Sequence, residues 1–145
     1  MADHLGGRRI EHAVAVAAPP ERVWRALADP AEAGRWAEGI VTLEPRPGGA
    51  VRFDWGELGA AHGRVVAVEP PHRLVFDWEG YPDASSTRIA FALAPDGAGT
   101  TVSLVHSGYG DGAEWDGVYN GEATGWVDLL DGLRRVAEGG DPERP

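Results

Sequence analysis

Alternating apolar and polar residues in the middle of the chain predict a series of β-strands. Val51, Phe53 and Trp55 alternate with Arg52 and Asp54, which is the two-residue period of a strand with one buried face. Similar segments, separated by turns rich in proline and glycine, cover residues 40–44, 62–69, 73–79, 87–94 and 100–107. Because these segments pair an apolar face with a polar one, we expect antiparallel strands with one side in water.

The N-terminal part of the chain adds one strand and two short helices. Alternation over residues 9–17 predicts the strand, and a proline pair ends it. A helix then begins at Pro20, since proline is tolerated in a first turn and Glu21 complements the helix dipole there. Asp29 is a favourable N-cap for a second short helix that reaches Trp36.

A long amphipathic helix is predicted near the C-terminal end, over residues 114–137. Its apolar face carries one acidic side chain among large apolar ones: Trp115, Tyr119, Glu122, Trp126, Leu129, Leu130, Leu133 and Val136. Such a helix is about 35 Å long, enough to cross a sheet. Three glycines, Gly117, Gly121 and Gly125, weaken its first half by about 0.5–1 kcal/mol each relative to alanine. They indicate either close packing on the sheet or an irregular segment that tightens on a ligand.

Together these elements predict an α+β domain with the helix-grip arrangement. A curved antiparallel sheet of six or seven strands wraps around the long C-terminal helix, and the two short helices follow the first strand. We expect a single domain over residues 9–137 with flexible tails at residues 1–8 and 138–145.

Composition and charge narrow the set of partners. The 145-residue chain has a net charge of −10, so it lacks the basic surface that nucleic acids and anionic membranes require. No apolar run reaches the roughly 18 residues that span a bilayer, and no signal-peptide pattern begins the sequence. The absence of cysteine excludes disulfides and a thiol nucleophile. We therefore expect a cytoplasmic monomer or homodimer with no nucleic-acid or membrane partner.

Several short motifs, taken in order, resemble one known superfamily. They are residues 14–30 with Trp36, Gly48 and Gly49, residues 63–78, residues 99–102, residues 106–108, and Gly125 with Trp126. This series is similar to the START-like (SRPBCC) superfamily, and within it to the branch related to the C-terminal domain of the heat-shock-protein-90 ATPase activator. The resemblance covers residues 9–137. Residues 118–126 also resemble enediyne self-resistance proteins, which bind the drug and are cleaved themselves.

Two histidines and a glutamate are the first candidates for chemistry. His106 shares a strand face with apolar residues and therefore points toward the core. The fold implied by the resemblance makes the first and last strands neighbours, so His12 is expected near His106, with Glu122 above them. His106, Glu122 and Tyr119 are the candidate catalytic residues, because such a group could transfer protons in a cyclisation or dehydration. The alternative is that His106 is a hydrogen-bonded structural residue.

A metal site is a weaker interpretation of the same residues. Two histidines and one carboxylate form a facial triad on paper, but the sequence contains no His-x-His or similar ligand spacing. Dinucleotide and phosphate-binding glycine loops are also missing from the sequence. We therefore expect neither a metal nor a cofactor.

The six tryptophans indicate either a thick core or an aromatic cavity. Trp24 is assigned to the core because it sits on the apolar stripe of a short helix. The candidate ligand-binding residues share an inward position on a strand or on the long helix: Trp36, Trp55, Trp78, His106, Trp115, Tyr119, Glu122, Trp126 and Leu130. Aromatic walls of this kind favour flat, apolar or polycyclic ligands.

Three functions remain open on the sequence. The leading hypothesis is a binding protein that holds a small hydrophobic or polycyclic molecule between the sheet and the C-terminal helix, in secondary metabolism or self-resistance. The second is an enzyme of polyketide cyclase or aromatase type that uses the His, Glu and Tyr candidates. The third is a co-chaperone-like interaction module, which the resemblance suggests by its name.

Overall fold

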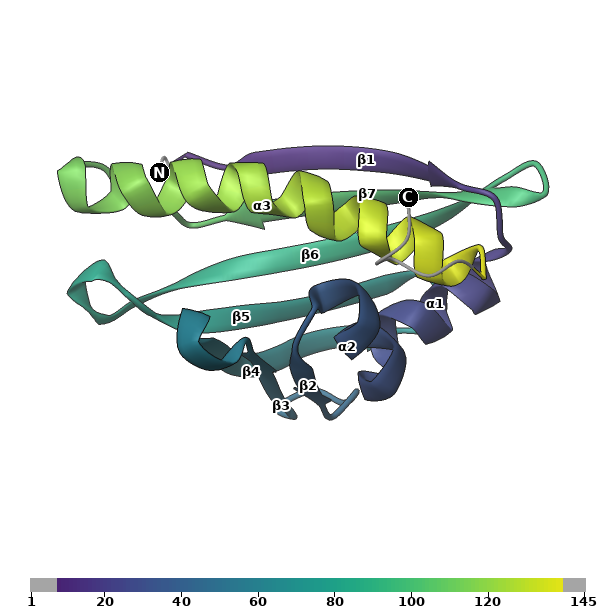
Figure 1. The fold of residues 1–145 in the computed structure, drawn as a ribbon, viewed down its shortest axis with the longest axis horizontal. Coiled ribbons are helices and arrows are strands. Elements are labelled where there is room, and N and C mark those ends of the chain that lie inside the picture. The colour runs from purple at the N-terminus through teal and green to yellow at the C-terminus, as the bar shows by residue number, and fades with distance from the viewer. Residues whose placement is uncertain (1–7, 140–145) are drawn as a thin grey trace.

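The computed structural model describes residues 8–139, which form one seven-stranded sheet, three α-helices and two short 3₁₀ segments (Figure 1). In chain order the elements are β1 (Ile10–Val16), α1 (Pro20–Ala28), α2 (Pro30–Ala37), β2 (Ile40–Leu43), β3 (Ala50–Asp54), η1 (Gly56–Leu58), β4 (Ala60–Glu69), β5 (Arg73–Tyr81), η2 (Pro82–Ala84), β6 (Ser85–Asp96), β7 (Gly99–Ser107) and α3 (Ala113–Ala137). Every predicted helix and strand is present, so the α+β helix-grip prediction is confirmed. The predicted tails lie outside the described residues except for residues 8, 138 and 139.

The sheet is antiparallel throughout, with the strand order β1-β7-β6-β5-β4-β3-β2. Strands β2 to β7 form a meander, in which each strand pairs with the next along the chain. β1 completes the sheet by pairing with β7, and Ile10 lies opposite His106. The expectation that the first and last strands are neighbours is therefore confirmed.

Local capping signals account for the two short helices. Pro20 and Pro30 occupy the first turns of α1 and α2, where the missing N–H would have had no partner. The Asp29 carboxylate accepts a hydrogen bond from the Ala31 amide at 3.1 Å, which satisfies one of the free donors at the start of α2. The predicted N-cap is thus confirmed.

Helix α3 lies across one face of the sheet, and its C-terminal half is close to α1 and α2 (Figure 1). In that half Leu133 and Val136 are fully buried. A Cβ atom at Gly132 would lie 3.2 Å from the backbone oxygen of Trp36, so a glycine at this position lets α3 approach α2 closely. Apolar packing therefore dominates this end of the helix.

Hydrogen bonds hold both ends of α3. At its N-terminal end Asp116 pairs with the Arg8 guanidinium at 2.7 Å, and the Tyr119 hydroxyl donates to the Arg9 backbone oxygen at 3.1 Å. At the C-terminal end the Arg22 guanidinium of α1 donates to the Val136 backbone oxygen at 2.9 Å. The helix is thus fastened to the chain near β1 at one end and to α1 at the other.

The glycine-rich first half of α3 is regular helix, not an irregular segment. A Cβ atom built at Gly117, Gly121 or Gly125 meets no atom within 4 Å outside its immediate surroundings. The close-packing explanation of these three glycines is therefore wrong, since they adjoin open space. Among residues 8–139, no helix has the length and hydropathy needed to cross a membrane.

Candidate functional site

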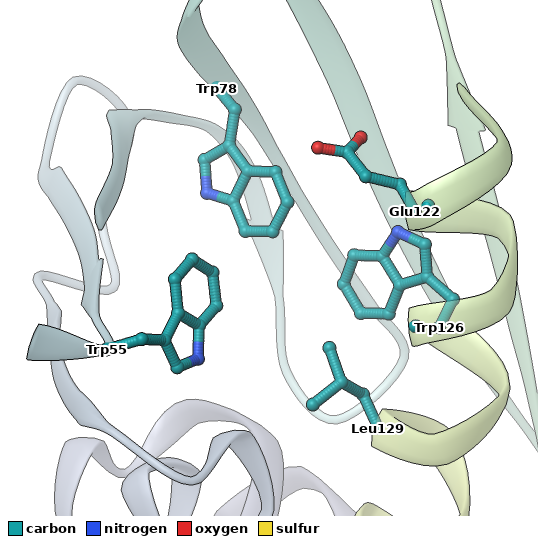
Figure 2. Close-up of a pocket in the computed structure, with 7 residues that line it drawn as sticks. Trp55, Trp78, Glu122, Trp126 and Leu129 are labelled. Carbon is teal, nitrogen blue, oxygen red and sulfur yellow. The ribbon is translucent and has the colours of Figure 1, made fainter. Parts of the chain in front are cut away.

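A cavity of about 200 Å³ lies between the middle of α3 and the strands β3 and β5 (Figure 2). Its lining consists of large apolar side chains, two glycines and one carboxylate: Trp55, Trp78, Gly121, Glu122, Gly125, Trp126 and Leu129. Figure 2 shows the two strand-side tryptophans facing Trp126 and Leu129 across the space, while the Glu122 carboxylate points toward Trp78. Gly121 and Gly125 enlarge this space because they carry no side chains.

A second cavity of about 310 Å³ adjoins the first and shares Trp55, Trp78 and Glu122 with it. Its outer wall comes from η1, the first residues of β4 and the turn that follows β5. Leu58, in η1, is 89 % exposed at this wall. The two cavities together form one cleft, which reaches the size range of small-molecule sites.

The three tryptophans of the cleft are fixed by different contacts. The Trp55 indole donates to the Ala37 backbone oxygen at 2.8 Å, and the Trp126 indole donates to His106 Nδ1 at 2.9 Å. Trp78 is buried, and its Nε1 has no hydrogen-bond partner. Its ring meets those of Phe53 and Trp55 edge to face. The wall is therefore preformed, with one indole donor unused.

A buried polar network lies directly behind the cavity. Its centre is His106, which is fully buried on β7. His106 Nε2 lies 2.7 Å from the Thr87 hydroxyl, and His106 Nδ1 lies 2.8 Å from the Tyr109 hydroxyl. The Tyr109 hydroxyl is in turn 2.5 Å from Glu122 Oε1. The Tyr81 hydroxyl donates to the Glu122 carboxyl group at 3.0 Å. The network thus links the cavity wall to the core of the sheet.

The tautomer of His106 follows from the Trp126 contact. An indole N–H can only donate, so His106 Nδ1 accepts from Trp126 and carries no proton. The proton of the neutral ring is then on Nε2, which donates to the Thr87 hydroxyl. Burial lowers the pKa of His106 to about 3, because the interior disfavours its charged form. His106 is therefore neutral at physiological pH.

Counting donors along the network also gives the direction of the Tyr109 contacts. The single lone pair of His106 Nδ1 accepts from the Trp126 indole. Tyr109 has one hydroxyl proton, which it donates to Glu122 Oε1 at 2.5 Å. The Tyr81 hydroxyl donates to the same carboxyl group, so Glu122 accepts from two tyrosines.

Burial and hydrogen bonding act on Glu122 in opposite directions. Burial raises the pKa of Glu122, and this effect outweighs the hydrogen bonds from Tyr109 and Tyr81 that lower it. Burial and the neighbouring Glu122 also raise the pKa values of both tyrosines. The side chain of Glu122 is still 32 % exposed. The cleft therefore presents a carboxyl group that solvent or a ligand can reach.

The structure brings together five of the nine predicted ligand-binding residues. Four of them line the cleft, namely Trp55, Trp78, Glu122 and Trp126. The fifth, His106, lines neither cavity and lies behind the wall, where it contacts Trp126 and Trp78.

The other four predicted residues lie elsewhere. Trp36 is buried in the core, where its indole donates to the Ala26 backbone oxygen at 2.7 Å. Trp115 stacks on the Tyr81 ring, outside both cavities. The Tyr119 hydroxyl bonds to the chain near β1, as described above, and the Arg8 guanidinium covers its ring. Leu130 faces a separate groove beside β1.

His12 does not join the network. It lies opposite Leu104 in the sheet, and its Nε2 approaches the Ala123 backbone oxygen at 3.4 Å. The nearer residue in register to His106 is Ile10. Within the described part of the chain, no group of three His, Cys, Asp or Glu side chains could hold a metal ion.

Sequence reasoning missed Tyr81, Tyr109, Thr87 and Leu129. Tyr109 lies between two glycines just after β7, where the strand period no longer tells which way a side chain points. Tyr81 precedes a proline at the end of β5, with the same loss of pattern. Leu129 was part of the predicted apolar face of the helix, but nothing in the pattern separated it from Leu130.

Comparison with solved structures finds the same fold in several bacterial proteins. DynU16, a protein of the dynemicin biosynthetic locus, is 28 % identical over 96 % of this chain with a TM-score of 0.79, and the match spans 50 % of DynU16. CalU16 from Micromonospora echinospora is 26 % identical with a TM-score of 0.74, covering 90 % of this chain and 76 % of CalU16. The Aha1 dimer from Colwellia psychrerythraea shares the fold, with a TM-score of 0.80 at 21 % identity over 91 % of this chain and 97 % of that one.

Comparison of the sequence with curated proteins gives no significant match. The family comparison is decisive, since residues 17–138 match the family described as Activator of Hsp90 ATPase homolog 1-like protein, AHSA1. The match includes α1, α2, the sheet from β2 to β7 and the whole of α3, and therefore both walls of the cleft. The chain belongs to the AHSA1 family.

Proposed function

We propose that the cleft between α3 and the sheet binds a small, flat, apolar molecule. The observation that carries this proposal is the open space beside Gly121 and Gly125, which faces Trp55 and Trp78 across the cavity. A helix that only had to cover the sheet would gain stability from alanine or leucine at these positions. Glycine there leaves room for a guest.

The lining suits an aromatic or polycyclic guest. Trp78 and Trp126 are nearly parallel, with ring centroids 5.8 Å apart and an interplanar angle of 13°, and Trp55 stands almost perpendicular to Trp78. Aromatic rings packed in offset or edge-to-face geometry gain energy beyond the area they bury. A guest ring can therefore use both the faces and the edges of this wall.

A role in secondary metabolism or self-resistance is the finer part of the proposal. It is supported by the similarity to DynU16, a protein of the dynemicin biosynthetic locus. A homodimer is a further possibility for this chain, supported by the fold it shares with the Aha1 dimer. The co-chaperone hypothesis has the family description as its support.

An enzyme of cyclase or dehydratase type is the second candidate, and one observation favours it. Glu122 lines the cavity and continues through Tyr109 to His106, so an acid in the cleft is joined to a chain of groups that exchange protons. Tyr109 takes the place that the sequence assigned to Tyr119. Catalysis requires Glu122→Gln to abolish turnover of a substrate that the variant still binds.

A cavity-filling variant tests the binding function. Gly125→Leu places a side chain in the cavity, whereas Gly117→Leu makes the same change on the same helix outside both cavities. We expect 2-naphthalenemethanol to raise the melting temperature of the wild type and of Gly117→Leu, because a ligand that binds only the folded state stabilises it. Gly125→Leu should show no such rise.

Isothermal titration calorimetry gives the corresponding affinities. If Gly125→Leu and Gly117→Leu bound the ligand equally well, the cleft would not be the binding site. Absence of binding to the wild type across naphthalene, anthracene and anthraquinone derivatives would contradict the function itself.

A further inference from the structure

We infer that the cleft selects a ligand that carries a protonated amine next to its flat apolar part, and that the amine pairs with the Glu122 carboxylate. This inference rests on the proposed binding function and specifies the chemical class of the ligand. Two independent features of the cleft carry it: the sign of its charges and the orientation of its aromatic rings.

The charged lining of the cleft is entirely acidic. Glu122 lines both cavities, and Glu79 lines the second one. Among the lining residues that the structure describes there is no arginine, lysine or histidine, and the histidine behind the wall is neutral because its Nδ1 accepts from Trp126. The chain as a whole has a net charge of −10. A cation is therefore attracted to the cleft at long range and finds no competing positive charge there.

The tryptophans supply the second feature. The negative face of an aromatic ring attracts a cation that lies within about 6 Å of its centroid, and tryptophan is the best such ring. Trp55 and Trp78 are nearly perpendicular, with centroids 6.4 Å apart, and Trp78 and Trp126 are nearly parallel. Rings set in two directions around one carboxyl group form a partial cage, which fits an ammonium group better than a hydroxyl.

The contacts of Glu122 leave it able to pair with a cation. Tyr109 and Tyr81 both donate to its carboxyl oxygens, and its side chain remains partly exposed. Burial raises the pKa of Glu122 because the interior disfavours its charged form. An ammonium group in the cleft offsets this cost by supplying the opposite charge, so the carboxylate and the amine form an ion pair.

The other titratable groups around Glu122 do not take over this role. Tyr81 from β5 and Tyr109 from the segment after β7 have raised pKa values and stay neutral. His106 from β7 is 3.8 Å from Glu122 and is neutral as well. Glu79 is half exposed and lies 3.7 Å from His62 on β4. Glu122 is therefore the group in the cleft that pairs with the amine.

Three probes with the same ring test this inference: 2-naphthylmethylammonium, neutral 2-naphthalenemethanol and anionic 2-naphthylacetate. We expect the ammonium probe to bind at least about tenfold more tightly than the alcohol. This factor corresponds to the free energy of a cation–π contact that is shielded from water. The acetate should bind more weakly than the alcohol. Isothermal titration calorimetry measures the three affinities.

Glu122→Gln keeps the shape and hydrogen bonds of the carboxyl group but removes its charge. It should abolish the preference for the ammonium probe, while the alcohol still binds. Glu114→Gln is the matched control, because it removes one charge from an exposed position on the same helix. It should leave the order of the three probes unchanged.

The outcomes separate the two proposals. If the alcohol binds and the ammonium probe binds no more tightly, the inference is wrong and the binding function stands. Tightest binding of the acetate, through the unused Trp78 N–H, would overturn it as well. If none of the three probes binds, both proposals fail. Should Glu122→Gln not fold, the order in which the wild type binds the three probes decides alone.

Discussion

The two halves of α3 use the same residue type for opposite purposes. In the C-terminal half Gly132 lets the helix approach the Trp36 backbone of α2, and a Cβ atom there would be crowded. In the N-terminal half Gly121 and Gly125 border a cavity that a side chain would partly fill. One half is built for packing and the other for space. A glycine in a helix is therefore informative only when its surroundings are known.

The largest expected difference between the packed end of α3 and the part that borders the cavity is in the cost of removing a leucine. Leu133 is fully buried, whereas Leu129 is half-buried at the cavity. We expect Leu133→Ala to lower the free energy of unfolding by about 2–5 kcal/mol, since it leaves a void in close packing. Leu129→Ala should cost less than about 1 kcal/mol, because it enlarges an existing space. Urea denaturation of both variants measures the difference, and equal losses would contradict it.

Adding a side chain should change the stability of the fold in opposite directions in the two halves. Gly132→Leu must displace the Trp36 backbone, and we expect it to destabilise the fold by about 1–3 kcal/mol. Gly117→Leu meets open space in a helix interior, so it should stabilise the fold by about 0.5–1 kcal/mol. Thermal and urea unfolding give both values. If Gly132→Leu were more stable than the wild type, α2 would move away without cost, and the two halves of α3 would not differ in packing.

The smallest expected effect is on the pH dependence of stability. It arises in the polar network, which the N-terminal half of α3 covers. The pKa of His106 is lowered to about 3 in the folded protein, so the unfolded chain binds the proton more readily. Stability is therefore complete above the ordinary histidine pKa of about 6.5 and is lost as pH falls below it. Between pH 6.5 and 5.5 this loss should be about 1 kcal/mol.

The variant His106→Gln isolates this contribution. Its free energy of unfolding should fall less steeply with decreasing pH than that of the wild type. The raised pKa of Glu122 acts in the opposite direction, since it favours the folded state as pH falls, and Glu122 is present in both proteins. The same slope in both proteins would show that His106 is not buried in a neutral form.

The fold was accessible from the sequence because its signals are local. Alternation along β3 and β7 fixes which side chains point inward, and Asp29 marks the start of α2 without any long-range contact. The site was only partly accessible. The pattern predicts that both Trp36 and Trp126 point inward, but whether they meet protein or space depends on residues distant in the sequence, such as Gly125 on α3 and Trp78 on β5.

The polar network shows the same limit more sharply. Glu122 was visible as an acid on an apolar helix face, and His106 as a histidine on an apolar strand face. Their link is Tyr109, which lies between glycines outside any regular element. Tyr119, at a regular helix position, was preferred in its place. Its hydroxyl instead bonds to the Arg9 backbone, because α3 lies close to β1.

The attachments of α3 have a mechanical consequence. Helix α3 is held at one end by the ion pair between Arg8 and Asp116, and at the other by the hydrogen bond from Arg22 to the Val136 backbone oxygen. These contacts oppose a movement of the helix away from the sheet. The opposite wall is less firmly held. η1 is a single short turn, and Gly56 at its start and Gly59 just after it both have positive φ. Leu58, within this turn, is largely exposed. We therefore expect movement of the turn at residues 56–59 to set the rate at which a ligand reaches the tryptophans, while the long helix stays in place.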